Sequence, residues 1–592
     1  MPRTTGDKAG GWKLKRWLEA CVLAAAVAAA FGNSLPNAFV FDDRRVIVEN
    51  RKVTRADIKG LWTEPASWFP DKDDTVWRPL TSTSFALNWK LSGPDPAAFR
   101  AVNLALHAAN SVLIVRLAEF MGLAGPVPML AGLLFALHPI HTEALNSIVG
   151  RADLLATLFV LLACLAYGRG RRLWAAGFFV LGLLSKESAA TFILLVPALA
   201  WLKPAAGGWR RVVRCCLLLA VFTGAYILYR RLAIGAFVPG AGAAAVPVGG
   251  AALELDNPLA ALPFFQRCSN AIYILWRYLL LCVYPGTLSA DYSPNAIPLL
   301  GVLSLRNLSA AAGLAAAGGL LWRWAGRRRE VLFAAGFFLL TFTIVSNMAF
   351  PIGTIMAERL LYLPSAGFCL LAAMAFPRGR GALPALAAAL LLCLYAGRSF
   401  TRNRDWRDDN ALFVKTAATS PASVRALVNA AQAQVERRKF AEARELVLRA
   451  LRLSPVTDKF PLPYNTLGLA HLGEGDLTAA ELAFREALKR DPLDLDARVN
   501  LGIVFARQRR YDGAIAAFET ALLTEPGAVK LHYNLALACR QKGEVVYAWG
   551  QQAEARGLFL KAGAHYEKAL ELKPDYAEAA AGLRALQALP GK

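Results

Sequence analysis

Long apolar runs before residue 400 are the feature that most restricts how this chain can fold. Of its 592 residues 56% are hydrophobic and 18% are charged, against about 25% charged residues in a typical soluble chain. The apolar runs reach the roughly 20 residues that cross a bilayer core. Residues 401–592 have the composition of a soluble domain. The sequence therefore predicts an all-α protein with a polytopic membrane domain at residues 1–400.

The distribution of basic residues predicts how the membrane domain is oriented. Most of the net charge of +23 lies before residue 401, in short loops between apolar runs. Such loops are usually cytoplasmic. Counting crossings from a cytoplasmic N-terminus gives about eleven spans, with an uncleaved first span and one re-entrant or interfacial segment within 264–298. Nucleic-acid binding is not expected, because the basic residues form no single stripe.

The same count places the first outer loop, 36–99, on the side that carries the soluble domain. Ionisable residues at membrane depth are costly and by default indicate function. Five clusters of unusual polar residues converge on this outer side, which is stronger evidence for a site than any one cluster. The clusters are Asp42-Asp43 with Arg78, His138 to Glu143, Arg151 to Asp153, Lys186-Glu187, and Glu358 to Tyr362.

The soluble part is predicted to be a tetratricopeptide-repeat α-solenoid. The pattern Ala480, Phe484, Ala487, Pro492 recurs 34 residues later as Ala514, Phe518, Ala521, Pro526. This is tetratricopeptide spacing. Glycines occupy matching positions in the first helices, and an extra 14 residues before the last repeat predict longer helices around Glu544–Phe559. We expect a linker at 401–421 and at least four repeats in 422–592, with a concave face that binds an extended protein segment.

The acidic pair Asp42-Asp43 has two readings. A carboxylate at an outer membrane surface can act as general base toward an acceptor hydroxyl, or it can bind a metal ion. Alternatively, it is a solvated loop carboxylate paired with Arg44 or Arg45. The convergence of clusters on one side favours the catalytic reading.

Four cations on the outer side are candidates for holding an anion, namely Arg78, Arg151, Lys186 and Arg359. Arg offers a planar fork of donors that suits phosphate, and Lys offers a point charge. Alternatively, these side chains extend toward lipid headgroups, or Lys186-Glu187 and Glu358-Arg359 pair with themselves. Their position beside a carboxylate pair predicts an anionic, lipid-linked substrate.

The remaining polar candidates are expected around the substrate. His138, His141 and Glu143 resemble a metal set, but Pro139 disrupts the helix that would align them. No third or fourth ligand is evident, so a metal site is not indicated. Hydrogen bonding to a polar ligand or packing at a helix end is expected there. Glu358 and Tyr362 complete the polar set.

These stretches together resemble the transmembrane and tetratricopeptide-repeat-containing (TMTC) family of protein O-mannosyltransferases, which have the GT-C glycosyltransferase fold. The resemblance covers nearly the whole chain in the same order. The matching stretches include Asn37–Asp43, Trp77–Phe85, Val102–His107, Leu137–Ala144, Val149–Ala156, Leu184–Ser188, Leu288–Ser293, Ala357–Ser365 and Asn403–Trp406.

The resemblance implies an inverting glycosyltransferase of EC class 2.4.1 that uses a polyprenyl-phosphate sugar, mannose or another hexose, as donor. It implies a base at Asp42 or Asp43, phosphate contacts from Lys186 and Arg359, and an acceptor Ser or Thr hydroxyl on an exported protein. The Ala-, Arg- and Leu-rich composition indicates a bacterial inner-membrane protein with a periplasmic site; in a eukaryote the site would face the ER lumen. Two alternatives stay open, a glycan or lipid acceptor and a non-enzymatic membrane-anchored repeat scaffold.

Overall fold

The structure, a computed structural model, describes residues 6–64, 67–69, 76–204, 208–234, 257–293, 295–377, 382–453 and 457–588. The described residues form helices and turns and contain no β-strand, so the all-α prediction is confirmed. The chain divides into two compact units, residues 1–420 and 421–592.

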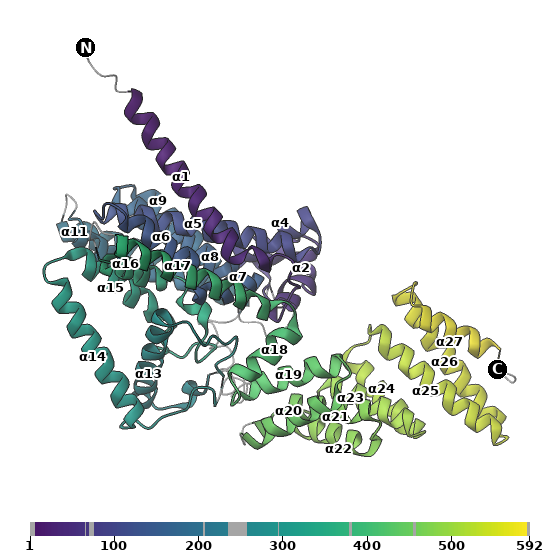
Figure 1. Cartoon of the computed structure of the whole chain (residues 1–592). Coiled ribbons are helices and arrows are strands. Elements are labelled where there is room, and N and C mark those ends of the chain that lie inside the picture. Colours follow the sequence, from purple (N-terminus) through teal and green to yellow (C-terminus); the bar gives the residue numbers. More distant parts are fainter. Residues whose placement is uncertain are drawn as a thin grey trace, which may run out of the picture. The chain divides into compact units, whose positions relative to one another are not determined.

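The N-terminal unit consists of long helices joined by short helical turns (Figure 1). Its helices are α1 Gly6–Phe31, α2 Arg51–Thr54, α3 Ile58–Thr63, α4 Pro79–Ser92, α5 Pro96–Phe120, α6 Val127–Leu137, α7 Thr142–Asn146, α8 Arg151–Gly168, α9 Arg172–Ser185, α10 Phe192–Leu202, α11 Gly208–Ile234, α13 Phe264–Val283, α14 Leu305–Ala325, α15 Arg329–Phe342, α16 Ser365–Ala375, α17 Ala382–Asn403 and α18 Asp409–Thr419.

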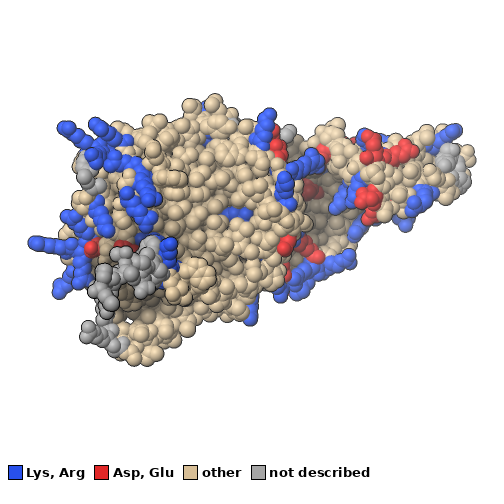
Figure 2. Space-filling view, turned by 90° about the horizontal axis from the view of Figure 1, so that it is seen from above, with Lys and Arg blue, Asp and Glu red and all other residues tan. Residues whose placement is uncertain are grey.

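Among the described residues of this unit, four stretches are long and apolar enough to cross a membrane, at Pro96–Phe120, Ile148–Gly168, Gly208–Leu232 and Ala382–Trp406. Shorter apolar helices accompany them at Val127–Leu137, Arg172–Ser185, Glu187–Leu202 and Ser365–Ala375. In Figure 2 a broad band of surface almost without charged side chains crosses this unit, and Lys and Arg side chains gather at its left edge. These features are those of a membrane protein. The total number of crossings stays a prediction.

The core of the N-terminal unit forms around α5, which packs against α1, α6 and α8; α6 also packs against α16, and α8 against α9. Helix α5 begins where Asp95 accepts a hydrogen bond of 3.0 Å from the Ala97 amide, with Pro96 as the first helical residue. This is a favourable N-terminal cap, because the side chain satisfies an amide that has no partner within the helix. The candidate site lies at one end of these helices.

The segment 401–421, expected as a linker, is largely helical. Helix α17 continues to Asn403, a short 3-10 turn covers Arg404–Trp406, and α18 follows. Residues up to Ser420 belong to the N-terminal unit. Pro139, as expected, interrupts the helix: α6 ends at Leu137 and a 3-10 turn precedes α7.

The C-terminal unit is an array of antiparallel helical hairpins. The hairpins are α19 Val424–Glu436 with α20 Phe440–Leu453, α21 Pro461–Glu474 with α22 Leu477–Arg490, α23 Leu495–Arg507 with α24 Tyr511–Thr524, and α25 Val529–Ala548 with α26 Gln552–Leu572, followed by α27 Ala577–Gln587. Helices α25 and α26 contain 20 and 21 residues, against 13 or 14 in the other hairpins. The prediction of longer helices around the insertion is therefore confirmed.

Glycines allow several neighbouring helices of the array to pack closely. A Cβ atom at Gly468 would lie 2.5 Å from the Phe484 ring, and one at Gly502 would lie 2.7 Å from the Phe518 ring. Both distances are too short for a real contact. The same close approach occurs within the last hairpin at Gly543 against Phe559, and between α27 and α26 at Gly582 against Tyr566. Glycine is therefore required where these helices meet.

We expect Gly502→Val to destabilise the C-terminal unit by about 1–3 kcal/mol, because the added side chain overpacks a filled contact. The loss of stability is measured by thermal unfolding of the purified full chain, with cleavage by a protease within the repeats as the signal of unfolding. Gly527→Ala is the control, since a Cβ there meets nothing within 4 Å. Equal midpoints for the two variants would contradict the packing argument.

Candidate active site

The two carboxylates of the acidic pair occupy different environments. Asp43 is fully buried, and its carboxylate accepts hydrogen bonds from the amides of Val149 at 3.0 Å and Val40 at 3.3 Å. Burial raises the pKa of Asp43 to about 6, against the opposing charge of Arg100. Asp42 is only partly buried. The two adjacent carboxylates therefore differ in burial, and Asp43 is the one enclosed by the protein.

Arg100, which the sequence did not single out, ties the first outer loop to the helices beneath it. Its guanidinium donates to the carbonyl oxygens of Asn37 and Ala38 and, at 3.2 Å, to that of Asn146. It is fully buried. A buried cation that donates to several carbonyls fixes their positions, because losing any of these bonds would leave charge unsatisfied. The start of the loop is therefore rigidly placed.

Arg151 lies inside the protein and not at an open surface. Its side chain is 1% exposed and donates to Asn103 Oδ1 at 2.9 Å, Asn88 Oδ1 at 2.9 Å and the Phe99 carbonyl at 2.8 Å. Its guanidinium also lies 4.9 Å from the centre of the Phe85 ring. With its donors used internally, Arg151 braces α4, α5 and α8.

Three ion pairs gather at the outer ends of the helices. Lys186 Nζ lies 2.7 Å from both oxygens of Asp153, Arg78 Nη2 lies 3.2 Å from Glu187 Oε2, and Arg359 pairs with Glu143. The residues come from α8, the turn between α9 and α10, the residue before α4, α7 and the turn Glu358–Leu361. Lys186 and Glu187 do not pair with each other, nor do Glu358 and Arg359.

Electrostatic effects show that these pairs form one cluster. Burial lowers the pKa of Lys186, Asp153 opposes this, and the charges of Arg78 and Arg359 lower it further. Arg359 in turn lies within electrostatic range of Asp42 and Asp153. Arg78, Lys186 and Arg359 therefore lie within electrostatic range of one another, and Asp42 lies within range of Arg359.

The two histidines predicted to lie around the substrate, His138 and His141, are inside the protein. His138 Nε2 lies 2.9 Å from the Cys282 carbonyl and His138 Nδ1 accepts from the Ile140 amide at 3.2 Å. His141 Nδ1 lies 2.9 Å from the Phe135 carbonyl. Both rings are fully buried. Of the two expectations for these histidines, packing at a helix end is therefore the one that the geometry supports.

Glu358 and Tyr362 are also buried. Glu358 Oε1 accepts from the Ser289 amide at 2.6 Å and from the Tyr292 hydroxyl at 2.8 Å. The Tyr362 hydroxyl lies 2.7 Å from Nδ1 of His107, a histidine on α5 that sequence reasoning did not assign. In the described part of the chain no group of three His, Cys, Asp or Glu side chains could hold a metal ion.

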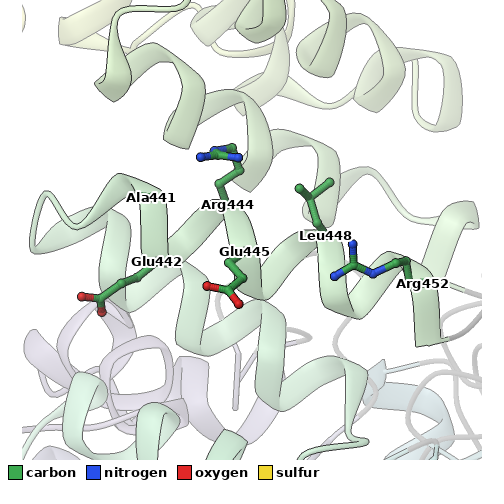
Figure 3. A pocket seen from close by; sticks show the side chains of 6 residues that line it. All are labelled: Ala441, Glu442, Arg444, Glu445, Leu448 and Arg452. Atoms are coloured by element: carbon green, nitrogen blue, oxygen red, sulfur yellow. The ribbon is translucent and has the colours of Figure 1, made fainter.

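A hollow on the repeat domain is separate from this cluster. It is lined by side chains that all project from α20, with charges of both signs (Figure 3). Its lining residues are Ala441, Glu442, Arg444, Glu445, Leu448 and Arg452. A shallow surface on one helix is not an enclosed pocket, so the candidate site remains the ion-pair cluster of the N-terminal unit.

Fold and cluster together define an all-helical membrane protein with a tetratricopeptide domain. Residues 252–318 match the family described as "Protein O-mannosyl-transferase TMTC, DUF1736", and residues 394–456, 465–525 and 501–562 match tetratricopeptide repeats. The resemblance to the TMTC family and the repeat prediction are therefore confirmed.

Named relatives match over most of the chain. Mouse protein O-mannosyl-transferase TMTC3 is 27% identical over 92% of this chain and 63% of its own length. Human protein O-mannosyl-transferase TMTC4 is 30% identical over 70% of this chain and 63% of its own. The chain thus spans about 63% of these relatives. The crystal structure of the tetratricopeptide protein YrrB covers 34% of this chain and 92% of its own, with 20% identity and a TM-score of 0.24.

The buried carboxyl group of Asp43 predicts a pH-dependent stability. The pKa of Asp43 is raised from 3.8 to about 6 in the folded protein. Ionisation is therefore penalised in the folded state only, so the free energy of unfolding should fall by up to about 3 kcal/mol as pH rises through this window. We expect Asp43→Asn to remove this component from unfolding curves of the detergent-purified chain between pH 3.5 and 7. An equal pH dependence in wild type and variant would refute it; Asp496→Asn, at an exposed carboxylate, is the control.

Proposed function

We propose that the chain is a GT-C glycosyltransferase that moves one hexose, mannose being the first candidate, from a polyprenyl phosphate to Ser or Thr hydroxyls of exported proteins. The observation that carries the proposal is the group of three ion-paired cations, Arg78, Lys186 and Arg359. The partly buried Asp42 lies within electrostatic range of Arg359. A base beside an anion site is what transfer from a sugar phosphate to a hydroxyl requires. The printed names of the relatives, protein O-mannosyl-transferases, support the same activity.

The chemistry divides between the two kinds of residue. Asp42 takes the proton of the acceptor hydroxyl as its oxygen attacks the anomeric carbon from the face opposite the phosphate. The bond between that carbon and the phosphate oxygen breaks, and the electron pair leaves with the phosphate. Cations at the departing oxygen stabilise the charge that develops there. A single displacement of this kind inverts the anomeric centre.

Among the three paired cations, Arg359 is best placed to meet the phosphate. Its side chain is 33% exposed, against 17% for Arg78 and 10% for Lys186. Arg can hold phosphate oxygens with two parallel donors. Lys186, held at 2.7 Å by both oxygens of Asp153, instead contributes charge from a fixed position. Arg78 and Glu187 flank it from the first outer loop and the turn after α9.

The setting follows from the predicted topology. The site and the repeats face the periplasm if the protein is bacterial, or the ER lumen if it is eukaryotic. There the repeats would hold an extended segment of the acceptor protein and raise its effective concentration at the cluster. The lipid carrier would reach the site from the surrounding bilayer.

Asp42→Asn tests the base directly. We expect kcat to fall by about a hundredfold to ten-thousandfold, the usual contribution of a positioned base, in an assay with undecaprenyl-phosphate mannose and a Ser/Thr-rich peptide. Glu64→Gln changes an exposed carboxylate of the same loop, with a side chain 56% exposed, and should keep the wild-type rate. A wild-type rate in Asp42→Asn would remove Asp42 from the mechanism.

Removal of residues 421–592 tests the acceptor. The cut follows the boundary between the two units. If the acceptor is a protein, the shortened chain should lose transfer to exported protein substrates by at least about tenfold, since the lost effective concentration commonly exceeds that factor. It should still bind the lipid-linked donor, which controls for an intact membrane unit. Undiminished transfer to these protein substrates would contradict the proposed role of the repeats in holding the acceptor.

A further inference from the structure

The backbone immediately before Asp42 adopts an unusual conformation. Phe41 has a φ angle of 51°, in the left-handed region that bulky side chains rarely occupy. Such residues persist only where surrounding contacts hold them, and they concentrate at functional sites. Because Phe41 directly precedes Asp42, its φ and ψ angles set the direction in which the Asp42 side chain leaves the loop.

Asp409 provides the contact that holds this conformation. The Phe41 amide donates a hydrogen bond of 2.7 Å to Asp409 Oδ1. The other carboxylate oxygen, Oδ2, lies 3.2 Å from Arg44 Nε. One carboxylate therefore binds the chain on both sides of Asp42. The Phe41 and Phe413 rings add an edge-to-face contact with centroids 5.7 Å apart.

The position of Asp409 is itself fixed. It is the first residue of α18, and the preceding Asp408 caps that helix by accepting a hydrogen bond of 2.8 Å from the Ala411 amide. The Ala38 amide donates to the Arg407 carbonyl at 2.9 Å. Val40, Trp406 and Leu412 form a small buried cluster. The loop and the start of α18 thus make a continuous contact, although they are 368 residues apart in sequence.

We infer that Asp409 is a positioning residue for Asp42, which it holds in place through the strained backbone of Phe41. This inference rests on the proposed function, because it assigns Asp409 a role in the same reaction. The contacts that define the role of Asp409 are those with the Phe41 amide and the Arg44 side chain. Asp409 therefore acts on the loop backbone and not on the ion pairs of the cluster.

Asp409→Ala is the principal test, with undecaprenyl-phosphate mannose and a Ser/Thr-rich peptide as probes and the full chain in detergent. Without the acceptor of the Phe41 amide, the loop can relax from the left-handed conformation and move Asp42. We expect kcat to fall at least tenfold while the KM for the lipid donor stays within twofold. We also expect the acid limb of the pH profile of kcat/KM to move to higher pH, because a carboxylate farther from Arg359 ionises less readily.

Two matched variants separate the hydrogen bond from the ion pair. Asp409→Asn keeps a carbonyl oxygen for the Phe41 amide but loses the negative charge, so it should retain most of the wild-type kcat. Arg44→Ala removes the ion pair alone. Its side chain is 58% exposed, and exposed pairs contribute little, so it too should resemble wild type.

A loss of folding is distinguished by a second readout. Thermal unfolding and the amount of purified chain report stability, and kcat is corrected for folded protein. If Asp409→Ala keeps the wild-type kcat per folded molecule and the wild-type pH profile, the inference is overturned, while an inactive Asp42→Asn would leave the proposed function standing. If Asp42→Asn is fully active, the proposed function fails independently of any result at Asp409.

Discussion

The cost of burying charge organises the N-terminal unit. A charged group moved out of water is tolerated only when it is paired and hydrogen-bonded. Lys186 meets this condition with both oxygens of Asp153 at 2.7 Å, and Arg100 meets it with three backbone carbonyls. Because each partner comes from a different segment, the pairing requirement fixes how the ends of the helices meet.

The position of the first outer loop depends in the same way on hydrogen bonds between polar side chains. Asn37, at the loop entrance, donates to Asn146 Oδ1 at 3.2 Å, and Asn146 donates to Asn403 Oδ1 at 2.8 Å. Asn403 donates to Asn33 Oδ1 at 2.6 Å. This line of amides, of which Asn37, Asn146 and Asn403 are buried, joins the turn after α1 to the ends of α7 and α17. The acidic pair is thus anchored by residues from across the chain.

Sequence reasoning identified the members of the charge cluster but not all of their roles. The sequence predicts that Asp42, Lys186 and Arg359 share one side of the membrane, and in the structure Arg359 lies within electrostatic range of the other two. The sequence did not predict that the Arg151 side chain is buried. An Arg at a helix end has the same local sequence whether its guanidinium is exposed to solvent or hydrogen-bonded to buried amide side chains. Arg100 carried no signal either, lying inside an apolar run where a single Arg is commonly taken as an interfacial residue.

The sequence by itself determined the all-helical class, the apolar stretches of membrane-crossing length and the repeat array, because these depend on local periodicity and composition. The glycine and aromatic positions of the repeats follow a fixed spacing, so even their packing was readable. Only the tertiary structure decided which carboxylate of the acidic pair is buried, which cation pairs with which anion, and that Asp409 holds Phe41. Those outcomes depend on contacts between segments far apart in the chain. Local sequence patterns do not predict which distant segments come into contact.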